Sequence, residues 1–234
     1  MAITFPRELP DVPYVTAEFV LDDPVRASPS GGRLINYTQI ADPAWRATLV
    51  TKPLVYSKFA EVEAWWLSLR EMKNVLFRHP HVCWPRNHNV NQGPAENTGN
   101  LVSVASGNIL TVNSVDAGLS LVPGDRIGLE YAGRWHVGRV TEFAGSGTTR
   151  TITIEPPPPT NVAQSGAVVR FVRPGCLMRP VPGSWSVQQS GGRYAASFQL
   201  VEAAGVGAVP EAPSSLDFSL VRNSQYAPLI LEIT

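Results

Sequence analysis

The sequence has few cysteines, few charged residues and no long apolar run, and each shortage excludes a class of protein. Two cysteines, Cys83 and Cys176, cannot build a disulfide framework, and we expect both to stay thiols in a reducing compartment. No apolar stretch approaches the ~20 residues that a membrane-spanning helix requires. The first residues lack the basic cluster and apolar segment of a secretory signal, so we expect synthesis in the cytoplasm without export by that route.

Charge is balanced as well as sparse. The chain has 19 basic and 19 acidic residues, so its net charge indicates neither a nucleic-acid nor a lipid partner. Glycine and proline are abundant, with 19 and 21 residues, and their turn-like spacing predicts many short strands joined by tight loops. With 234 residues, 44% of them apolar, the chain can form one large β domain or two small ones. Composition therefore predicts a mainly β protein.

Sequence motifs of catalysis are absent. We find no Gly-x-Ser-x-Gly nucleophile elbow, phosphate-binding loop, His-Glu-x-x-His zinc motif or dinucleotide fingerprint. Several carboxylates lie close together in the sequence, and we expect solvent to hydrate them: Asp22 with Asp23, Glu61 with Glu63 and Glu71, and Asp125 with Glu130. We therefore predict that the protein is not an enzyme, with no catalytic residue and no cofactor.

Residue types that bind metals cluster once in the sequence. His79, His81 and Cys83 alternate along one predicted strand, and His88 follows. Pro80 would disturb that strand, and no second cluster completes a coordination shell. We therefore expect these residues to make packing or interface contacts, with no metal site.

Two predicted strands flank a helix between Trp45 and Trp84. The first strand alternates apolar and polar residues from Trp45 onward, as expected when one face meets a core. The second extends from Val75 to Trp84, and Pro80 within it predicts a sheet edge or a bulge. A further strand is expected at 33–37, after a turn rich in proline and glycine.

The predicted helix extends from Ser57, a candidate N-cap, to Met72, and Asn74 is a suitable stop. Its apolar residues fall at spacings of three and four and form one stripe: Phe59, Val62, Trp66, Leu69 and Met72. Charged residues fill the other side. We expect the stripe to face the sheet to which the two strands belong.

The partners of these strands are expected far along the chain, at 184–202. Ser190-Gly191-Gly192 predicts a hairpin turn there, because glycine adopts positive φ without strain. Four apolar residues of the second strand share one face: Tyr194, Ala196, Phe198 and Leu200.

Residues 98–173 predict a separate small β-barrel of the OB or SH3 type. Turn residues separate five strand-sized runs: 108–113, 126–131, 134–143, 149–155 and 167–172. The turns themselves are explicit: Pro123-Gly124-Asp125, Ala132-Gly133 and Gly145-Ser146-Gly147. The prolines at 156–159 cannot enter a ladder, so we expect an extended spacer.

The six tryptophans divide into two groups. Three occupy core-facing positions of regular elements: Trp45, Trp66 and Trp185. The other three could stack on sugars or bases, although burial is favoured for them too: Trp65, Trp84 and Trp135.

The order and spacing of these segments resemble the distal tail proteins of long-tailed bacteriophages and prophages. The resemblance rests on Trp-Arg-Ala-Thr at 45–48, the helix at 57–72, Pro-Gly-Asp-x-Ile at 123–127, Arg-x-x-Val at 134–137, and Gly-Gly-Arg-Tyr-x-x-Ser-Phe-x-Leu-Val-Glu-Ala at 191–203. It covers nearly the whole chain, and its specificity lies in the order of the segments.

The resemblance implies a structural virion protein at the distal end of the tail, assembled in the host cytoplasm. Proteins of this family form a ring, expected to have six subunits, that joins the tail tube to the hub or tip complex. The implied partners are further copies of the chain, the tail tube protein and the hub or tip proteins, with the tape measure protein and tail fibres as further candidates. Neither a membrane nor a specific nucleic-acid sequence is an expected partner.

The resemblance also implies a domain organisation. Residues 1–97 and 174–204 would form a tail-tube-like β-sandwich or barrel with one flanking helix, interrupted by the inserted barrel at 98–173. We expect residues 205–234 to form an extended C-terminal arm. Its apolar residues would contact a neighbouring subunit: Phe218, Leu220, Leu229, Ile230 and Leu231.

Three alternatives remain open from the sequence. The chain could be another ring of the tail, such as a tube or terminator subunit. It could instead be a carbohydrate-binding adhesion module that uses Tyr131, Trp135 and His136 of the insertion. A hydrolase would require the cluster from His79 to His88 to bind a metal.

Overall fold

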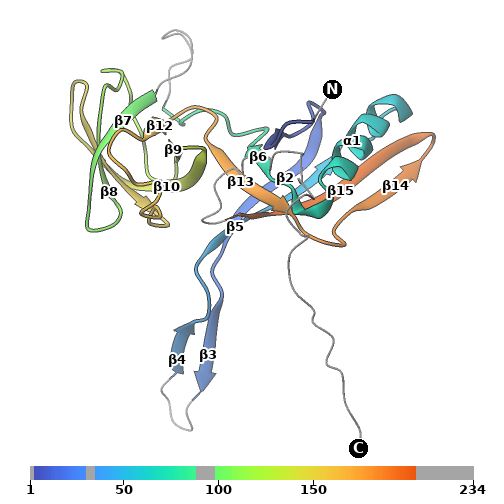
Figure 1. Cartoon of the computed structure of the whole chain (residues 1–234), viewed down its shortest axis with the longest axis horizontal. Coiled ribbons are helices and arrows are strands. Elements are labelled where there is room, and N and C mark those ends of the chain that lie inside the picture. The colour runs from blue at the N-terminus through green and yellow to red at the C-terminus, as the bar shows by residue number, and fades with distance from the viewer. Residues whose placement is uncertain (1–2, 30–34, 88–97, 204–234) are drawn as a thin grey trace, which may run out of the picture.

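The computed structural model describes residues 3–29, 35–87 and 98–203, and it confirms a mainly β protein. Strands hold 50% of the residues and helices 8%. Two bodies lie side by side, a sheet covered by an α-helix and a closed barrel, and a long hairpin projects away from both (Figure 1).

The larger body is a seven-stranded sheet built from segments that lie before and after the barrel in the sequence. Its main path is β1 (Arg7–Glu8), β6 (Val75–Arg78), β13 (Gly175–Pro180), β15 (Arg193–Glu202), β5 (Ala44–Thr51) and β2 (Tyr14–Asp22), and β14 (Ser186–Ser190) also pairs with β15. The sequence predicts β5, β6, β14 and β15, but it does not predict β1, β2 or β13. The expected pairing of β5 with the distant β15 is present. The same expectation is wrong for β6, which pairs with β13 and β1 and with no strand of 184–202.

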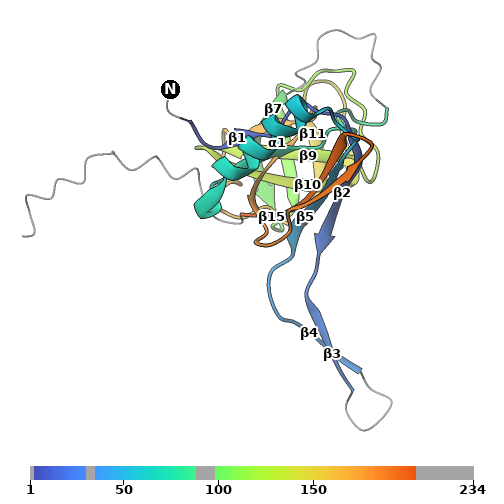
Figure 2. The same cartoon turned by 90° about the vertical axis from the view of Figure 1, so that its right-hand side faces the viewer.

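The helix α1 (Tyr56–Ser68) lies across the sheet and is followed by the 3₁₀ turn η1 (Arg70–Met72) (Figures 1 and 2). The helix begins at Tyr56 and its N-cap is Val55, so the prediction of Ser57 as the N-cap is wrong. No side chain makes a capping hydrogen bond there, so packing against the sheet stabilises this end of the helix.

The buried side of α1 is rotated slightly from the predicted stripe. Trp65 is only 4% exposed, whereas Trp66 is partly buried and packs against the edge of the core. Met72 is 42% exposed, because the regular helix ends at Ser68 and its periodicity does not continue into the 3₁₀ turn. The other three residues of the predicted stripe are buried.

Aromatic rings fill much of the space between α1 and the sheet. Trp66 stacks on Trp185 with ring centroids 5.2 Å apart, and Phe59 stacks on Tyr194 at 4.9 Å. Such pairs add specific geometry to the burial of apolar area. As predicted, β15 contributes three buried residues to this core: Ala196, Phe198 and Leu200.

The smaller body is a closed barrel with the strand order β10-β11-β8-β7-β12-β9. Its strands are β7 (Thr98–Ala105), β8 (Ile109–Asn113), β9 (Arg126–Tyr131), β10 (Arg134–Ala144), β11 (Arg150–Glu155) and β12 (Val168–Arg170). Five of these correspond to the predicted runs, and the unpredicted β7 closes the barrel between β8 and β12. The barrel has its own buried core, which includes Leu110, Ile127, Leu129, Ile152 and Ile154.

A separate two-stranded sheet consists of β3 (Val25–Pro29) and β4 (Ile35–Gln39). It continues from the ends of β2 and β5 and projects far from the sheet and the barrel in both views (Figures 1 and 2). The strand predicted at 33–37 corresponds to β4, whereas β3 was not predicted.

Candidate functional site

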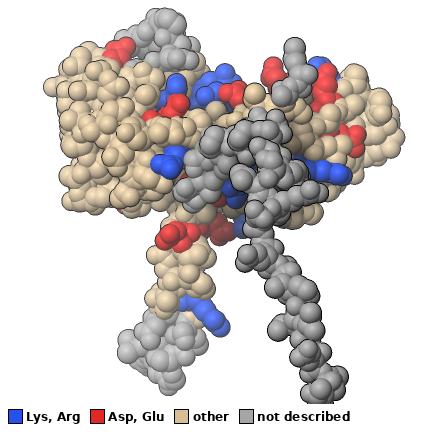
Figure 3. All heavy atoms as spheres, viewed as in Figure 1, with Lys and Arg blue, Asp and Glu red and all other residues tan. Residues whose placement is uncertain are grey.

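The barrel is docked on the sheet through a buried junction. Trp45 of β5 donates its indole N–H to the carbonyl oxygen of Val137 in β10 over 2.7 Å. The Val137 side chain packs into the core of the sheet, although its strand belongs to the barrel. In the space-filling view, charged side chains are scarce over the barrel and more frequent around this junction (Figure 3). Two clefts lie beside it.

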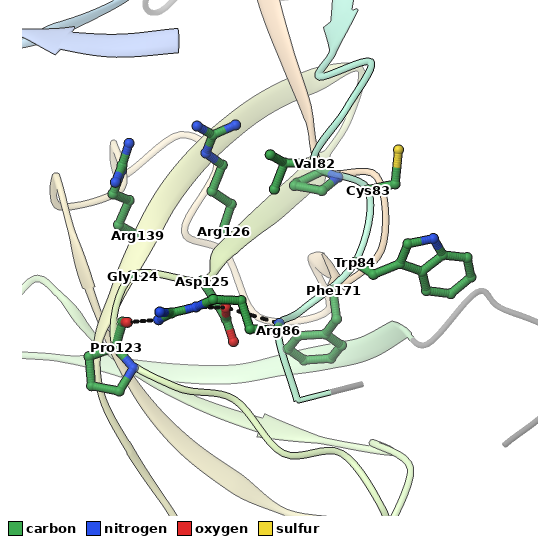
Figure 4. A pocket seen from close by; sticks show the side chains of 11 residues that line it. Val82, Cys83, Trp84, Arg86, Pro123, Gly124, Asp125, Arg126, Arg139 and Phe171 are labelled. Carbon is green, nitrogen blue, oxygen red and sulfur yellow. Dashed lines mark hydrogen bonds and ion pairs between the residues drawn. The ribbon is translucent and has the colours of Figure 1, made fainter. Parts of the chain in front are cut away.

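The first, which we call the arginine cleft, has a volume of about 320 Å³ (Figure 4). Its walls come from the segment after β6, from the turn before β9, from β10 and from the end of the barrel. The lining residues are Val82, Cys83, Trp84, Arg86, Pro123, Gly124, Asp125, Arg126, Arg139, Phe171 and Pro174.

Asp125 anchors one side of the arginine cleft. Its buried carboxylate accepts hydrogen bonds from the backbone N–H and the Nε of Arg86, both at 3.2 Å, and from the backbone N–H of Val122 at 2.9 Å. Arg86 also donates to the Pro123 carbonyl oxygen. Asp125 therefore ties the segment after β6 to the predicted Pro-Gly-Asp turn. The expectation that solvent hydrates Asp125 is therefore wrong, since this residue is 4% exposed, and Glu130 pairs with Arg170 at 2.7 Å.

Arg126 and Arg139 occupy the opposite side of the arginine cleft. They face each other across the antiparallel pair of β9 and β10. The Arg126 guanidinium lies 5.0 Å from the Phe19 ring centroid, and that of Arg139 lies 5.8 Å from the Trp45 ring. Burial, and then the charge of Arg139, lower the pKa of Arg126 to about 10. Sequence reasoning did not identify this pair, although the predicted two-residue turn at Ala132-Gly133 fixes the register that creates it.

The expected strand face with three metal-ligand residues does not form, because β6 ends at Arg78, before Pro80. The His79 ring instead makes three hydrogen bonds to backbone groups. Its Nε2 donates to the Ala17 carbonyl oxygen at 2.8 Å, and its Nδ1 accepts from the N–H groups of His81 and Val82 at 3.1 and 2.9 Å. Burial, assisted by the charge of Arg126, lowers the pKa of His79 to about 4.

Cys83 follows this turn, and its thiol lies 3.6 Å from the His79 carbonyl oxygen. Among residues 3–29, 35–87 and 98–203, no three His, Cys, Asp or Glu side chains converge as a metal site would require. His88 lies outside the described residues. Cys83 and Cys176 are both free thiols, as expected.

The second cleft, which we call the tryptophan cleft, has a volume of about 530 Å³. It lies between the barrel, the base of the projecting hairpin and the end of β15. The lining residues are Asp23, Gln39, Asp42, Pro43, Arg134, Trp135, His136, Pro156, Pro157, Pro159, Asn161, Val162, Glu202 and Ala203. Of the residues predicted for sugar binding, Trp135 and His136 line this cleft and Tyr131 does not.

His136 and Glu202 form a buried polar contact in the wall of the tryptophan cleft, with Nδ1 and Oε1 4.0 Å apart. His136 Nε2 lies 3.1 Å from the Pro156 carbonyl oxygen, which assigns the ring proton to Nε2. Burial lowers the pKa of His136 to about 4 and raises the pKa of Glu202. His136 is therefore neutral at pH 7, and this contact is not an ion pair.

The remaining candidate residues have ordinary structural roles. Asp22 pairs with Arg46 at 2.9 Å, and Glu61 pairs with Lys58 at 2.8 Å, both on the surface. Trp84 is 42% exposed at the rim of the arginine cleft. The five residues predicted for the C-terminal arm lie outside the described residues, as does the Glu71 side chain.

The fold and these clefts define a mainly β protein with a sheet, a docked closed barrel and two clefts at their junction. Within the described part of the chain, no helix is long and apolar enough to cross a membrane. Neither a scan against protein-family models nor a search of curated proteins found a match.

Proposed function

We propose that the protein is a structural subunit of a ring, expected to be hexameric, that joins the distal end of a phage tail tube to the hub or tip complex. In this proposal the sheet with α1 is the tail-tube-like unit, and the barrel is its OB- or SH3-like insertion. The sequence resemblance suggests this role, and the projecting hairpin formed by β3 and β4 is the structural observation that carries it. Tail tube and hub or tip proteins would be its partners, with no enzymatic activity.

The hairpin formed by β3 and β4 has no neighbouring strand among the described residues. In the described part of the structure, its two strands pair with each other and with no other strand. A lone two-stranded hairpin is at best marginally stable in water. The hairpin region also presents large apolar side chains to solvent, with Tyr37 70% exposed, Ile40 64% and Val25 45%. A second protein surface would both support these strands and bury these side chains.

A ring gives each subunit one surface to offer and another to receive its neighbour. Such heterologous contacts close into a ring when the rotation between subunits is an integral fraction of a turn. The edge strand β2 offers a receiving surface, because Val15 and Val20 are exposed along it and β5 is its one strand partner among the described residues. The hairpin of one subunit would then pack beside β2 of the next.

The oligomeric mass of the purified chain tests this proposal. Replacing both Tyr37 and Ile40 with serine should convert a ring into monomers in mass photometry, because two apolar contacts are lost at each interface. A matched control replaces Val102, an exposed apolar residue of the barrel strand β7, and should leave the ring intact. A ring that persists after the hairpin substitutions would contradict the proposed interface, and a monomeric wild-type chain at high concentration would contradict the proposed function.

A carbohydrate-binding adhesion module is the second candidate, and the tryptophan cleft favours it. An indole ring beside planar polar side chains is a common arrangement for stacking on a sugar and bonding its hydroxyl groups. Glycan-array binding by the full chain that disappears on Trp135→Ala would support this candidate. Another tail ring, such as a tube or terminator subunit, would be distinguished by its position in electron micrographs of assembled tails.

A further inference from the structure

We infer that the arginine cleft is a binding site for a phosphate group, held between Arg126 and Arg139. The first argument is the pairing itself. The two arginines lie directly opposite each other on neighbouring strands, where like charges repel. Among the described residues, neither side chain makes an ion pair or a hydrogen bond, so their charges are not compensated there.

The nearby carboxylate does not offset this charge. Asp125 lines the same cleft, but it already accepts from Arg86 and from the backbone N–H of Val122. Figure 4 shows the guanidinium groups of Arg126 and Arg139 side by side, both directed away from Asp125 and Arg86. The cleft therefore contains two unpaired cations next to a completed ion pair.

The two guanidinium groups are also held in place. Arg126 lies over Phe19 and Arg139 over Trp45, and these two rings stack on each other with centroids 4.5 Å apart. Contacts with ring faces leave the N–H groups at the guanidinium edges available for hydrogen bonds. Arg126 Nη1 is buried without a hydrogen-bond partner in the described part of the chain, a state that costs free energy until the group is satisfied. The site is thus positioned before any ligand arrives.

Phosphate suits this arrangement better than other small anions. Its oxygens match the paired N–H groups of guanidinium, and its charge at neutral pH exceeds that of a carboxylate. A volume of about 320 Å³ admits a phosphate group but not a large ligand. Val82 and Phe171 add apolar surface to the wall of the cleft. The group could be free phosphate or the phosphoryl end of an organic molecule.

Titration calorimetry of the full chain at low ionic strength tests the site. Inorganic phosphate represents the free anion, phenyl phosphate represents a phosphoryl group on an organic molecule, and acetate represents a carboxylate. We expect saturable phosphate binding and weaker acetate binding. Tighter binding of phenyl phosphate would identify an organic phosphate as the ligand, and equal binding would identify the free anion. Absence of saturable phosphate binding up to about 10 mM, or tighter binding of acetate, would overturn the inference.

Arg139→Gln is the decisive variant, because Arg139 is exposed and its replacement should not prevent folding. Loss of its charge-assisted hydrogen bonds should weaken phosphate binding about tenfold or more. Arg193→Gln is the matched control, since Arg193 is an exposed arginine at the distant start of β15. The phosphate-dependent rise in melting temperature should disappear in Arg139→Gln and persist in Arg193→Gln. Equal responses of the two variants would show that any binding is general charge attraction and would refute the site.

Discussion

His79 and His136 are both buried in their neutral forms, one beside the arginine cleft and the other in the tryptophan cleft. Each donates its Nε2 proton to a backbone carbonyl oxygen, and burial lowers each pKa to about 4. An unfolded chain would protonate the same rings near their ordinary pKa of 6.5. Protonation is therefore linked to unfolding at both residues.

The sign of this linkage predicts acid sensitivity. Between pH 6.5 and 4 the unfolded state binds more protons at these histidines, so their contribution to stability is present above pH 6.5 and is lost as the pH falls toward 4. For His136 the loss should approach about 3 kcal/mol. Glu202, whose pKa burial raises, acts in the opposite direction and offsets part of the loss.

Urea unfolding at a series of pH values measures this prediction. His136→Gln should flatten the decline. Glu202→Gln should steepen it, because the glutamine side chain can still accept from the backbone N–H of Trp45, as Glu202 does at 2.9 Å, but cannot titrate. An NMR titration of the histidine rings checks the assignment directly. A His136 ring that titrates near pH 6.5 in the folded protein would contradict the proposed cause.

Only part of the arginine cleft could be predicted from the sequence, for reasons that differ from residue to residue. The turn at Pro123-Gly124-Asp125 was predictable, because proline and glycine set its backbone and the carboxylate accepts backbone N–H groups within it. The pairing of Arg126 with Arg139 could also have been predicted, since the hairpin turn at Ala132-Gly133 fixes the register of the two strands. The contact between Phe19 and Arg126 could not have been predicted, because Phe19 belongs to β2, a strand without a clear alternating pattern in the sequence.

At the scale of elements, two of the five strands that escaped prediction, β2 and β7, share a feature that weakens the sequence pattern. Both β2 and β7 contain a register shift, between Tyr14 and Thr16 in one and between Leu101 and Ser103 in the other. A bulge moves later side chains to the opposite face, so alternation of period two fails along such a strand. The strands with unbroken alternation, β5 and β15, were predicted with nearly their observed ends.

The hairpin of β14 and β15 supports a test of turn chemistry. Gly191 and Gly192 both have positive φ, at 55° and 73°, and no atom lies within 4 Å of a Cβ added at Gly192. Gly192→Val should therefore destabilise the protein through backbone strain alone, by about 1–2 kcal/mol. Gly192→Asn, which tolerates this conformation, should cost clearly less in the same urea unfolding experiment. Equal stabilities of the two variants would exclude backbone strain as the cause.

At the scale of the molecule, the barrel is an insertion in sequence but a packed neighbour in space. Replacing residues 98–173, the inserted barrel, with a short glycine-serine linker should preserve a folded sheet and the proposed ring. It should also lower the melting temperature, because the Trp45 indole loses its acceptor and Val137 leaves the core of the sheet. Circular dichroism and mass photometry of the shortened chain measure the two outcomes.

Trp45→Phe in the full chain is the control for that deletion, because it removes the hydrogen bond between sheet and barrel but keeps the barrel. It removes the indole N–H and leaves the Val137 carbonyl oxygen unpaired, which should cost about 1–3 kcal/mol. The deletion should cost more than this single change. A shortened chain that cannot fold would show instead that the sheet depends on the barrel for its structure.

The strand β10 belongs to both bodies at once. Val137 packs into the core of the sheet, and Val140, three residues later on the same strand, packs into the core of the barrel. The tilt of the barrel is therefore fixed by packing contacts, which include those of β10 and the hydrogen bonds between Asp125 and Arg86. In any symmetric assembly of this chain, every barrel would repeat at the same angle, so rotational averaging of electron micrographs should resolve barrels as sharply as sheets.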